Sequence, residues 1–210
     1  TPSNMVVSVA GKVEHERLAR QVDSLCDRWA PHTVPQPTPF SHSQSAQKLR
    51  LEYRKTEQLH LAIGVPGLSM VHPDRYALGL LSTAFGEGMS SRLFLEVREK
   101  RGLAYDIQSG LTHFQDCGAL VINGAVDPGK AETAVETILA ETGRLREGLT
   151  LEELEKAKRL STGRMMLRME DTRAVSAWMG SQELLLGRVL DLDEIVDSID
   201  SVTPEEINRV

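Results

Sequence analysis

Histidine motifs are the first chemistry to test in this sequence of 210 residues, which contains six histidines and two cysteines. Two imidazoles four residues apart on one helix face, with a carboxylate between them, would predict a zinc site. Residues 15–19 read HERLA, so Ala19 stands where the second ligand of an H-E-x-x-H motif should be. Residues 113–117 read HFQDC, the outline of the inverted motif, but this segment is predicted to be a strand end and a turn rather than a helix. The residues predict no metal site in this chain.

Motifs for nucleophilic catalysis and for anion binding are also weak. The sequence has no G-x-S-x-G elbow, and neither Cys26 nor Cys117 has a histidine nearby in a recognisable arrangement. Residues 86–88 (GEG) precede a predicted helix and could cradle an anion with free helical N–H groups, but the carboxylate between the glycines disfavours phosphate. We interpret them as a turn into a helix that begins at Ser90 or Ser91. No catalytic residue is predicted.

The elements that must position any site are mixed helices and antiparallel strands. Apolar residues recur every three or four positions in residues 14–29, and they alternate with polar residues in residues 48–65. Capping residues, prolines and glycines mark the ends of several other predicted helices. The predicted strands are residues 4–11, residues 48–65 (two strands or one long bent strand), residues 103–113 and residues 117–126. The predicted helices are residues 14–29, 74–85, 90–102, 129–146, 151–169, 173–186 and 191–199, and a last helix from residue 203. Because the two types do not alternate strictly, the pattern favours an α+β, two-layer domain over a doubly wound fold.

Composition and charge limit the classes of function. The chain has 24 Lys and Arg against 30 Asp and Glu, a net charge of −6, with both signs interspersed. Neutralising phosphates requires clustered Lys and Arg, so neither nucleic acid nor a membrane is an expected partner. The apolar stretches are too short to span a bilayer, and the first residues are not a signal sequence, although a signal could have been removed. The two cysteines are typical of a reducing compartment, which favours the cytoplasm over a periplasmic or organellar location.

The most informative segment is residues 86–105, which read GEGMSSRLFLEVREKRGLAY. It resembles the G-G-G-M-S-S-R-L-F-x-E-[IV]-R-E-x-x-G-L-[AC]-Y stretch in the second domain of the pitrilysin (insulinase) family of zinc metallopeptidases, to which insulin-degrading enzyme and mitochondrial processing peptidase belong. Three further segments resemble that family in the same order, so the resemblance covers essentially the whole chain: residues 56–61 (TEQLHL), 151–158 (LEELEKAK) and 201–207 (SVTPEEI). It implies an α+β, two-layer antiparallel-sheet and helix domain of the mitochondrial processing peptidase-like metallohydrolase type. Phe85 and Glu87 depart from the Leu and Gly usual in the family.

The resemblance implies two substrate-binding residues. In the family an Arg and a Tyr seven positions later hold the substrate, and Arg98 and Tyr105 match them. A guanidinium offers fixed donors to a peptide carbonyl, and a phenol can donate to the oxygen that becomes negative when water attacks. The alternative is an exposed Arg on a charged helix face and a Tyr packed against its strand neighbours. The nearby cations Arg92, Lys100 and Arg101 are interpreted as solvated charges.

The family's zinc motif is missing from this chain. An H-x-x-E-H motif with a further Glu lies in the first domain of the family, and no such motif occurs here. By the resemblance, residues 1–30 match the closing strand and helix of that zinc domain. Residues 31–46 form a proline-rich linker, and residues 47–210 match the second, substrate-binding domain, truncated before its last strand. Zinc is therefore expected in a complementary domain or subunit. Residues 4–11 could supply the missing strand, in the same chain or exchanged within a dimer.

Three functions fit these observations. The leading hypothesis is the non-zinc half of a pitrilysin-type zinc metalloendopeptidase, which positions a peptide or protein substrate at a zinc site on another domain or subunit and is inactive alone. The alternative is a non-catalytic scaffold or partner subunit of a processing-peptidase-like complex. A third is a stand-alone module that binds peptides at an exposed strand edge. Arg98 and Tyr105 favour the first, because a pure scaffold needs neither.

Overall fold

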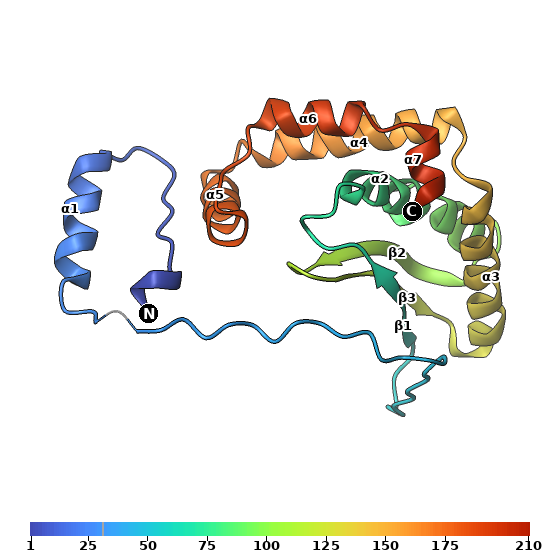
Figure 1. The fold of residues 1–210 in the computed structure, drawn as a ribbon. Coiled ribbons are helices and arrows are strands. Elements are labelled where there is room, and N and C mark those ends of the chain that lie inside the picture. Colours follow the sequence, from blue (N-terminus) through green and yellow to red (C-terminus); the bar gives the residue numbers. More distant parts are fainter. Residues whose placement is uncertain (31) are drawn as a thin grey trace. The chain divides into compact units, whose positions relative to one another are not determined.

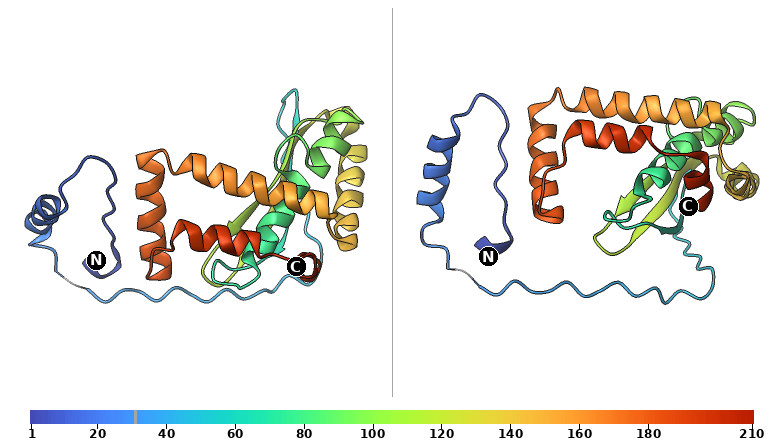
Figure 2. Two further views of the ribbon diagram at one scale, coloured as in Figure 1. Left: turned by 90° about the horizontal axis from the view of Figure 1, so that it is seen from above. Right: turned by 45° about the horizontal axis from the view of Figure 1, so that its top comes forward.

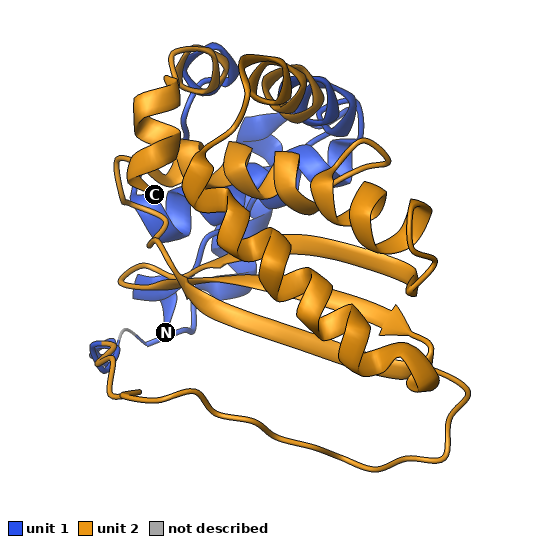
Figure 3. Cartoon of the chain, turned by 90° about the vertical axis from the view of Figure 1, so that its right-hand side faces the viewer, with its two compact units in different colours: residues 1–39, 162–195 blue, residues 40–161, 196–210 orange. Residues whose placement is uncertain are grey.

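The computed structural model describes residues 1–30 and 32–210. The predicted linker begins at Pro31, which lies outside the described residues. The chain divides into two units, shown in Figure 1 as a ribbon and coloured separately in Figure 3. Unit 1 comprises residues 1–39 and 162–195, and unit 2 comprises residues 40–161 and 196–210.

The described residues contain helices and a three-stranded sheet, so the predicted α+β class is confirmed. The strands are β1 (Leu59–Gly67), β2 (Ala104–His113) and β3 (Gly118–Val126). The α-helices are α1 (His15–Cys26), α2 (Arg75–Gly86), α3 (Ala131–Arg144), α4 (Leu151–Arg168), α5 (Thr172–Leu186), α6 (Leu192–Asp200) and α7 (Pro204–Arg209). A π-helical segment, Phe94–Glu99, lies between α2 and β2, and short 3₁₀ turns span Pro2–Asn4, Pro128–Lys130 and Leu145–Glu147.

The sheet of unit 2 is antiparallel, with the strand order β1-β3-β2. Ile63 on β1 and Ser109 on β2 both lie opposite Ile122 on the central strand. Alternate side chains of each strand point to the same face, and the face that carries Ile122 packs against helices. Figure 1 and Figure 2 show α2 lying across this face. The core of unit 2 joins the strands to α2, α3 and the π-helical segment through Phe85, Leu93, Val97, Leu103, Ala104, Ile107, Ile122, Val126, Ala134 and Ile138.

The helices and the sheet of unit 2 make a close contact where α2 meets β2. Ser109 Oγ donates to the carbonyl oxygen of Ser82 at 2.9 Å, and the two serine hydroxyls lie 3.1 Å apart. Both serines are buried, so these bonds satisfy polar groups that water cannot reach. A Cβ atom on Gly86 would lie 2.3 Å from the backbone nitrogen of Ser109. Only glycine at residue 86 allows α2 to approach β2 this closely.

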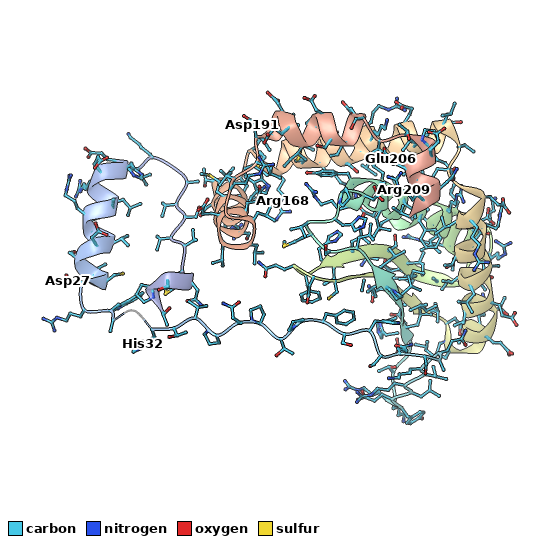
Figure 4. All side chains as sticks on the ribbon, in the orientation of Figure 1. Asp27, His32, Arg168, Asp191, Glu206 and Arg209 are labelled. Atoms are coloured by element: carbon cyan, nitrogen blue, oxygen red, sulfur yellow. The ribbon has the colours of Figure 1, made fainter. Side chains whose placement is uncertain are left out.

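α7 is joined to the start of α2 by an ion pair. Arg209 Nε donates to Asp74 Oδ2 at 2.9 Å, and Nη2 donates to the other carboxylate oxygen. This hydrogen bond holds the pKa of Asp74 below its ordinary value. Thr203 and Glu206 form a capping box at the start of α7, as their spacing predicts. Figure 4 labels Glu206 and Arg209 on this helix.

In unit 1 the predicted helix over residues 14–29 is confirmed as α1, but the predicted strand at residues 4–11 is wrong. Residues 5–10 form no strand, and the three-stranded sheet contains none of them. Instead, Ser176 Oγ on α5 donates to the carbonyl oxygen of Ser8 at 2.8 Å. None of the twelve residues of α1 is buried.

The prediction for residues 48–65 is confirmed only in its second part. Residues 59–65 lie within β1, whereas residues 48–53 are coil in spite of their alternating pattern. Figure 3 shows residues 40–58 as a coil outside the sheet. The predicted helix over residues 90–102 is also only partly right, because most of its helical residues are π-helical.

The contact between α2 and β2 predicts a large cost for a methyl group at residue 86. We expect Gly86→Ala to lower the free energy of unfolding by about 2–4 kcal/mol, because the Cβ must push α2 away from the β2 backbone. Urea denaturation followed by circular dichroism measures this difference.

Gly79→Ala is the matched control, because Gly79 lies in the same helix and an added Cβ there meets nothing within 4 Å. It should leave stability unchanged or raise it by up to about 1 kcal/mol through helix propensity. Equal effects of the two substitutions would contradict the close contact at Gly86.

Candidate substrate-binding site

A widened helical turn positions Arg98. The Lys100 N–H donates to the carbonyl oxygen of Leu95, five residues back, at 2.9 Å, which gives the segment its π-helical form. The Leu103 N–H then donates to the carbonyl oxygen of Val97 at 2.9 Å and closes the turn. Leu93 and Val97 are completely buried, whereas Arg98 is exposed. The turn is therefore anchored in the core on one side and presents Arg98 on the other. Short π-helical segments occur frequently at functional sites.

A β-bulge positions Tyr105. Ala104 lies opposite Val126 and Asp106 lies opposite Ala125, so Tyr105 is an extra residue in β2. The bulge breaks the alternation of β2: Ala104 and Ile107 are both buried, and Tyr105 is 75% exposed. Bulges of this kind redirect side chains and are common beside active sites.

The structure brings the two residues together. The Arg98 guanidinium carbon lies 5.8 Å from the centre of the Tyr105 ring and 4.8 Å from the centre of the Phe94 ring. Gly102, with φ +55°, provides the left-handed residue that lets the chain turn from the π-helical segment into β2. Contacts between a cation and a ring at these distances are favourable and hold the guanidinium over the rings.

The polar atoms of both side chains are free to meet a ligand. In the described part of the chain, neither the Arg98 guanidinium nor the Tyr105 hydroxyl has a hydrogen bond or an ion pair with another residue. A guanidinium carries five N–H donors and a phenol carries one O–H donor. The pair can therefore donate to the carbonyl oxygens of a peptide, which carries one such acceptor on every residue.

Lys100 and Arg101, interpreted from the sequence as solvated, share one carboxylate. Both donate to Glu96, and Arg101 also donates to the Glu96 carbonyl oxygen at 2.8 Å. These bonds, with that from Lys100 the largest, hold the pKa of Glu96 below its ordinary value. Both cations remain exposed.

Arg92 was interpreted in the same way, and here the interpretation is wrong. Its Nε and Nη2 atoms donate to the two carboxylate oxygens of Glu153 at 2.6 and 2.8 Å, and its side chain is only 18% exposed. Nη2 also donates to the Gly148 carbonyl oxygen at 2.8 Å. The bond to Arg92 is the main cause that lowers the pKa of Glu153 to about 2. Glu153 also accepts from the Thr150 N–H at the start of α4, so the pair joins the segment before Arg98 to that helix.

The described residues contain no group of three His, Cys, Asp or Glu side chains that could hold a metal ion. In the HFQDC segment, His113 instead makes a 2.7 Å hydrogen bond between Nδ1 and the Leu68 carbonyl oxygen. Cys26 and Cys117 are free thiols. None of the described helices is long and apolar enough to cross a membrane.

The family comparison agrees with the resemblance found in the sequence. A family profile described as the peptidase M16 inactive domain matches residues 1–161, and the chain belongs to this family. The chain is therefore an inactive domain of an M16-type zinc protease family.

Two relatives are about twice as long as this chain. An uncharacterised zinc protease of Streptomyces coelicolor is 36% identical over 216 residues, covering 100% of this chain and 47% of the relative. An uncharacterised zinc protease of Bacillus subtilis is 34% identical over 209 residues, covering 99% of this chain and 50% of the relative. The chain spans about half the length of these relatives.

Solved structures share the fold. A crystal structure of a peptidase M16 inactive domain from Pseudomonas fluorescens is 26% identical with a TM-score of 0.66, and the match covers 73% of this chain and 37% of that one. A protease from Helicobacter pylori is 21% identical with a TM-score of 0.83, and the match covers 95% of this chain and 49% of that one.

The ion pair between Arg92 and Glu153 predicts a pH-dependent stability. The pKa of Glu153 falls from an ordinary 4.5 to about 2 on folding, so its stabilisation is complete above pH 4.5 and is lost as the pH falls towards 2. We expect Glu153→Gln to lower the free energy of unfolding by about 2 kcal/mol at pH 7, between the values for exposed and buried pairs. The difference from the unsubstituted chain should shrink as the pH falls from 4.5 to 2.

Glu152→Gln is the control for this measurement, because Glu152 is an exposed neighbour on the same turn that pairs with Lys156. Urea denaturation at several pH values should show a change below about 0.5 kcal/mol for this variant. A constant difference between Glu153→Gln and the unsubstituted chain from pH 7 to pH 2 would refute the assignment.

Proposed function

We propose that this chain is the substrate-binding, non-zinc half of an M16-type zinc metalloendopeptidase. The observation that carries the proposal is the convergence of Arg98 and Tyr105, two exposed side chains with free donors, at a core-anchored turn and a bulge. In this role the two side chains hold a peptide in an extended form by its carbonyl oxygens. In the same role the phenol of Tyr105 donates to the oxygen that becomes negative as water attacks.

The proposal places zinc outside this chain. The relatives of about twice the length are named zinc proteases, yet the described residues do not offer a zinc ligand set. We therefore assign the metal to a complementary domain or subunit, and we derive no chemical step through it in this chain. The chain alone should not hydrolyse peptides.

Residues 1–30 are proposed to belong structurally to that complementary zinc domain. α1 has a strongly amphipathic sequence and yet buries none of its residues. The segment before it exposes Met5, Val7 and Val9. An apolar stripe of this kind is expected to pack against another element. Residues 31–46 then act as the linker to residues 47–210, the proposed second domain.

Peptide hydrolysis tests the substrate-binding role. A mixture of this chain with a zinc-bearing partner half should cleave a fluorogenic peptide, whereas neither half should do so alone. Arg98→Ala should lower kcat/KM by about 10- to 100-fold, because hydrogen bonds to a charged group contribute roughly 1.5–3 kcal/mol. Tyr105→Phe removes one donor and should lower it by about 2- to 10-fold.

Arg101→Ala is the matched control, because Arg101 is an exposed cation three residues away whose donors go to Glu96. It should change kcat/KM by less than about twofold. If the mixture is active and neither Arg98→Ala nor Tyr105→Phe reduces the activity, the chain acts as a scaffold subunit and the substrate-binding role is wrong. Stoichiometric zinc and peptide hydrolysis in the chain alone would overturn the assignment of the metal.

Deletion of residues 1–30 tests the proposed domain boundary. α1 buries none of its residues, and the hydrogen bond from Ser176 Oγ to the Ser8 carbonyl oxygen that the deletion removes is a single partly buried contact, so we expect the melting temperature of the remaining chain to change by less than about 2 °C. The loss in circular dichroism should correspond to α1 alone. A melting temperature lower by more than about 5 °C would place these residues in the same cooperative fold as the second domain.

A further inference from the structure

The sheet of unit 2 has a second face, opposite to the one that packs against the helices. Alternate side chains of each strand point to this face, which carries His60 on β1, Asn123 on β3 and Gln108 on β2. All three residues are exposed, whereas Ile122, next to Asn123 in the chain, is 2% exposed on the core face. Figure 1 shows α2 on the core side of the sheet. We call the side that carries His60, Gln108 and Asn123 the open face.

The bulge in β2 places Tyr105 at the open face. Tyr105 and Asp106 together lie opposite Ala125, whereas Ala104 lies opposite Val126. Ala104 and Val126 belong to the core, but Tyr105 and Asp106 are both exposed. The candidate substrate-binding site is therefore continuous with the open face of the sheet.

Two carboxamides lie side by side on the open face, one step along β2 from the bulge. Gln108 is directly opposite Asn123, which places their Cβ atoms about 4.5–5.5 Å apart. Asn is disfavoured within strands, yet Asn123 lies inside the central strand of the sheet. In the part of the chain that the structure describes, neither carboxamide has a hydrogen bond to another residue. Each offers two N–H donors and one oxygen acceptor.

The residues around the two carboxamides leave room for another chain. Asn123 lies opposite Ala62 on β1, and the next residues along the open face of β1 and β2 are Gly64 and Gly110. A Cβ atom added to either glycine would meet nothing within 4 Å. A peptide backbone can therefore approach Gln108 and Asn123 without meeting a large side chain.

The spacing along β2 matches that of an extended peptide. A strand rises about 3.4 Å per residue, so Asp106 and Gln108 are about 7 Å apart on the open face. An extended peptide also presents its backbone N–H and carbonyl groups to one side at every second residue, with the same repeat. When one peptide carbonyl oxygen accepts from Tyr105, the next backbone groups on that side come within reach of the two carboxamides.

We propose that Gln108 and Asn123 are positioning residues that bind the backbone of the substrate two residues beyond the carbonyl group held by Tyr105. The inference rests on the proposed function, in which Arg98 and Tyr105 hold an extended peptide. The carboxamides donate to a peptide carbonyl oxygen and accept from a peptide N–H group. Because these backbone groups recur along every peptide, the contact selects extended substrates that continue past Tyr105, whatever their side chains.

Hydrolysis by the mixture of this chain with a zinc-bearing partner half tests the two residues together. For a ten-residue fluorogenic peptide, the double variant Gln108→Ala and Asn123→Ala should lower kcat/KM by about 3- to 30-fold, because it removes hydrogen bonds between neutral groups. Asn208→Ala is the matched control, because Asn208 is an exposed carboxamide on α7, which is joined to α2 on the core side of the sheet. It should change kcat/KM by less than about twofold.

The same assay separates this inference from the proposed function. If Arg98→Ala lowers kcat/KM and the double variant does not, the carboxamides do not bind substrate, while the role of Arg98 stands. If neither variant lowers it, both the proposed function and this inference are wrong.

Nitrogen-15 NMR of the full chain gives a readout that a purely structural role would not change. Addition of the ten-residue peptide should shift the side-chain NH₂ signals of Gln108 and Asn123 and leave the NH₂ signals of Asn208 in place. A blocked dipeptide, which is too short to reach past Tyr105, should shift neither of the first two. If the ten-residue peptide shifts the backbone signal of Tyr105 but not the carboxamide signals, the peptide leaves the open face at Tyr105 and the inference is wrong.

Discussion

The close approach of α2 to β2 is the constraint on which the candidate site depends. Gly86 ends α2 directly over Ser109, so the end of the helix and the middle of the strand are fixed to each other. The π-helical segment begins eight residues after Gly86, and β2 begins five residues after that segment ends. Leu93 and Val97, which lie on this connection, are completely buried in the core. Arg98 and Tyr105 therefore lie on a segment that is held in place at both ends.

Two irregularities in this segment, the π-helical turn and the β-bulge, determine how the side chains of Arg98 and Tyr105 are oriented. A regular α-helix would bond the Lys100 N–H four residues back instead of five, so the turn that carries Arg98 would be narrower. An unbulged β2 would place Tyr105 on the same face as the buried Ile107, because side chains alternate along a regular strand. The bulge leaves Tyr105 and Asp106 both exposed while Ala104 and Ile107 stay buried. Such irregularities need support from their surroundings. Here the buried residues on either side of them provide it.

Local patterns in the sequence were enough to predict most of the helices and strands, but not which segments pair with another strand in the sheet. The capping box of Thr203 and Glu206 depends on neighbours within one turn, and the helix that it predicts is confirmed as α7. A strand also needs another backbone at its edge, which residue spacing does not supply. Residues 4–11 and 48–53 have strand-like sequences but no ladder in the structure. The bidentate contact between Arg92 and Glu153 joins residues 61 positions apart, so composition alone made Arg92 look solvated.

The four cations between residues 92 and 101 show why charge alone does not identify a binding residue. Arg92 donates through Nε and Nη2 to the two carboxylate oxygens of Glu153, and Lys100 and Arg101 both donate to the carboxylate of Glu96. Their donors already have partners. Arg98 lies over the Phe94 and Tyr105 rings instead, and stacking occupies the face of the guanidinium but not the N–H groups at its rim. A stacked arginine is therefore both positioned and free to donate. The sequence could identify Arg98 only through the family motif, because the property that separates it from its neighbours is the partner each cation meets after folding.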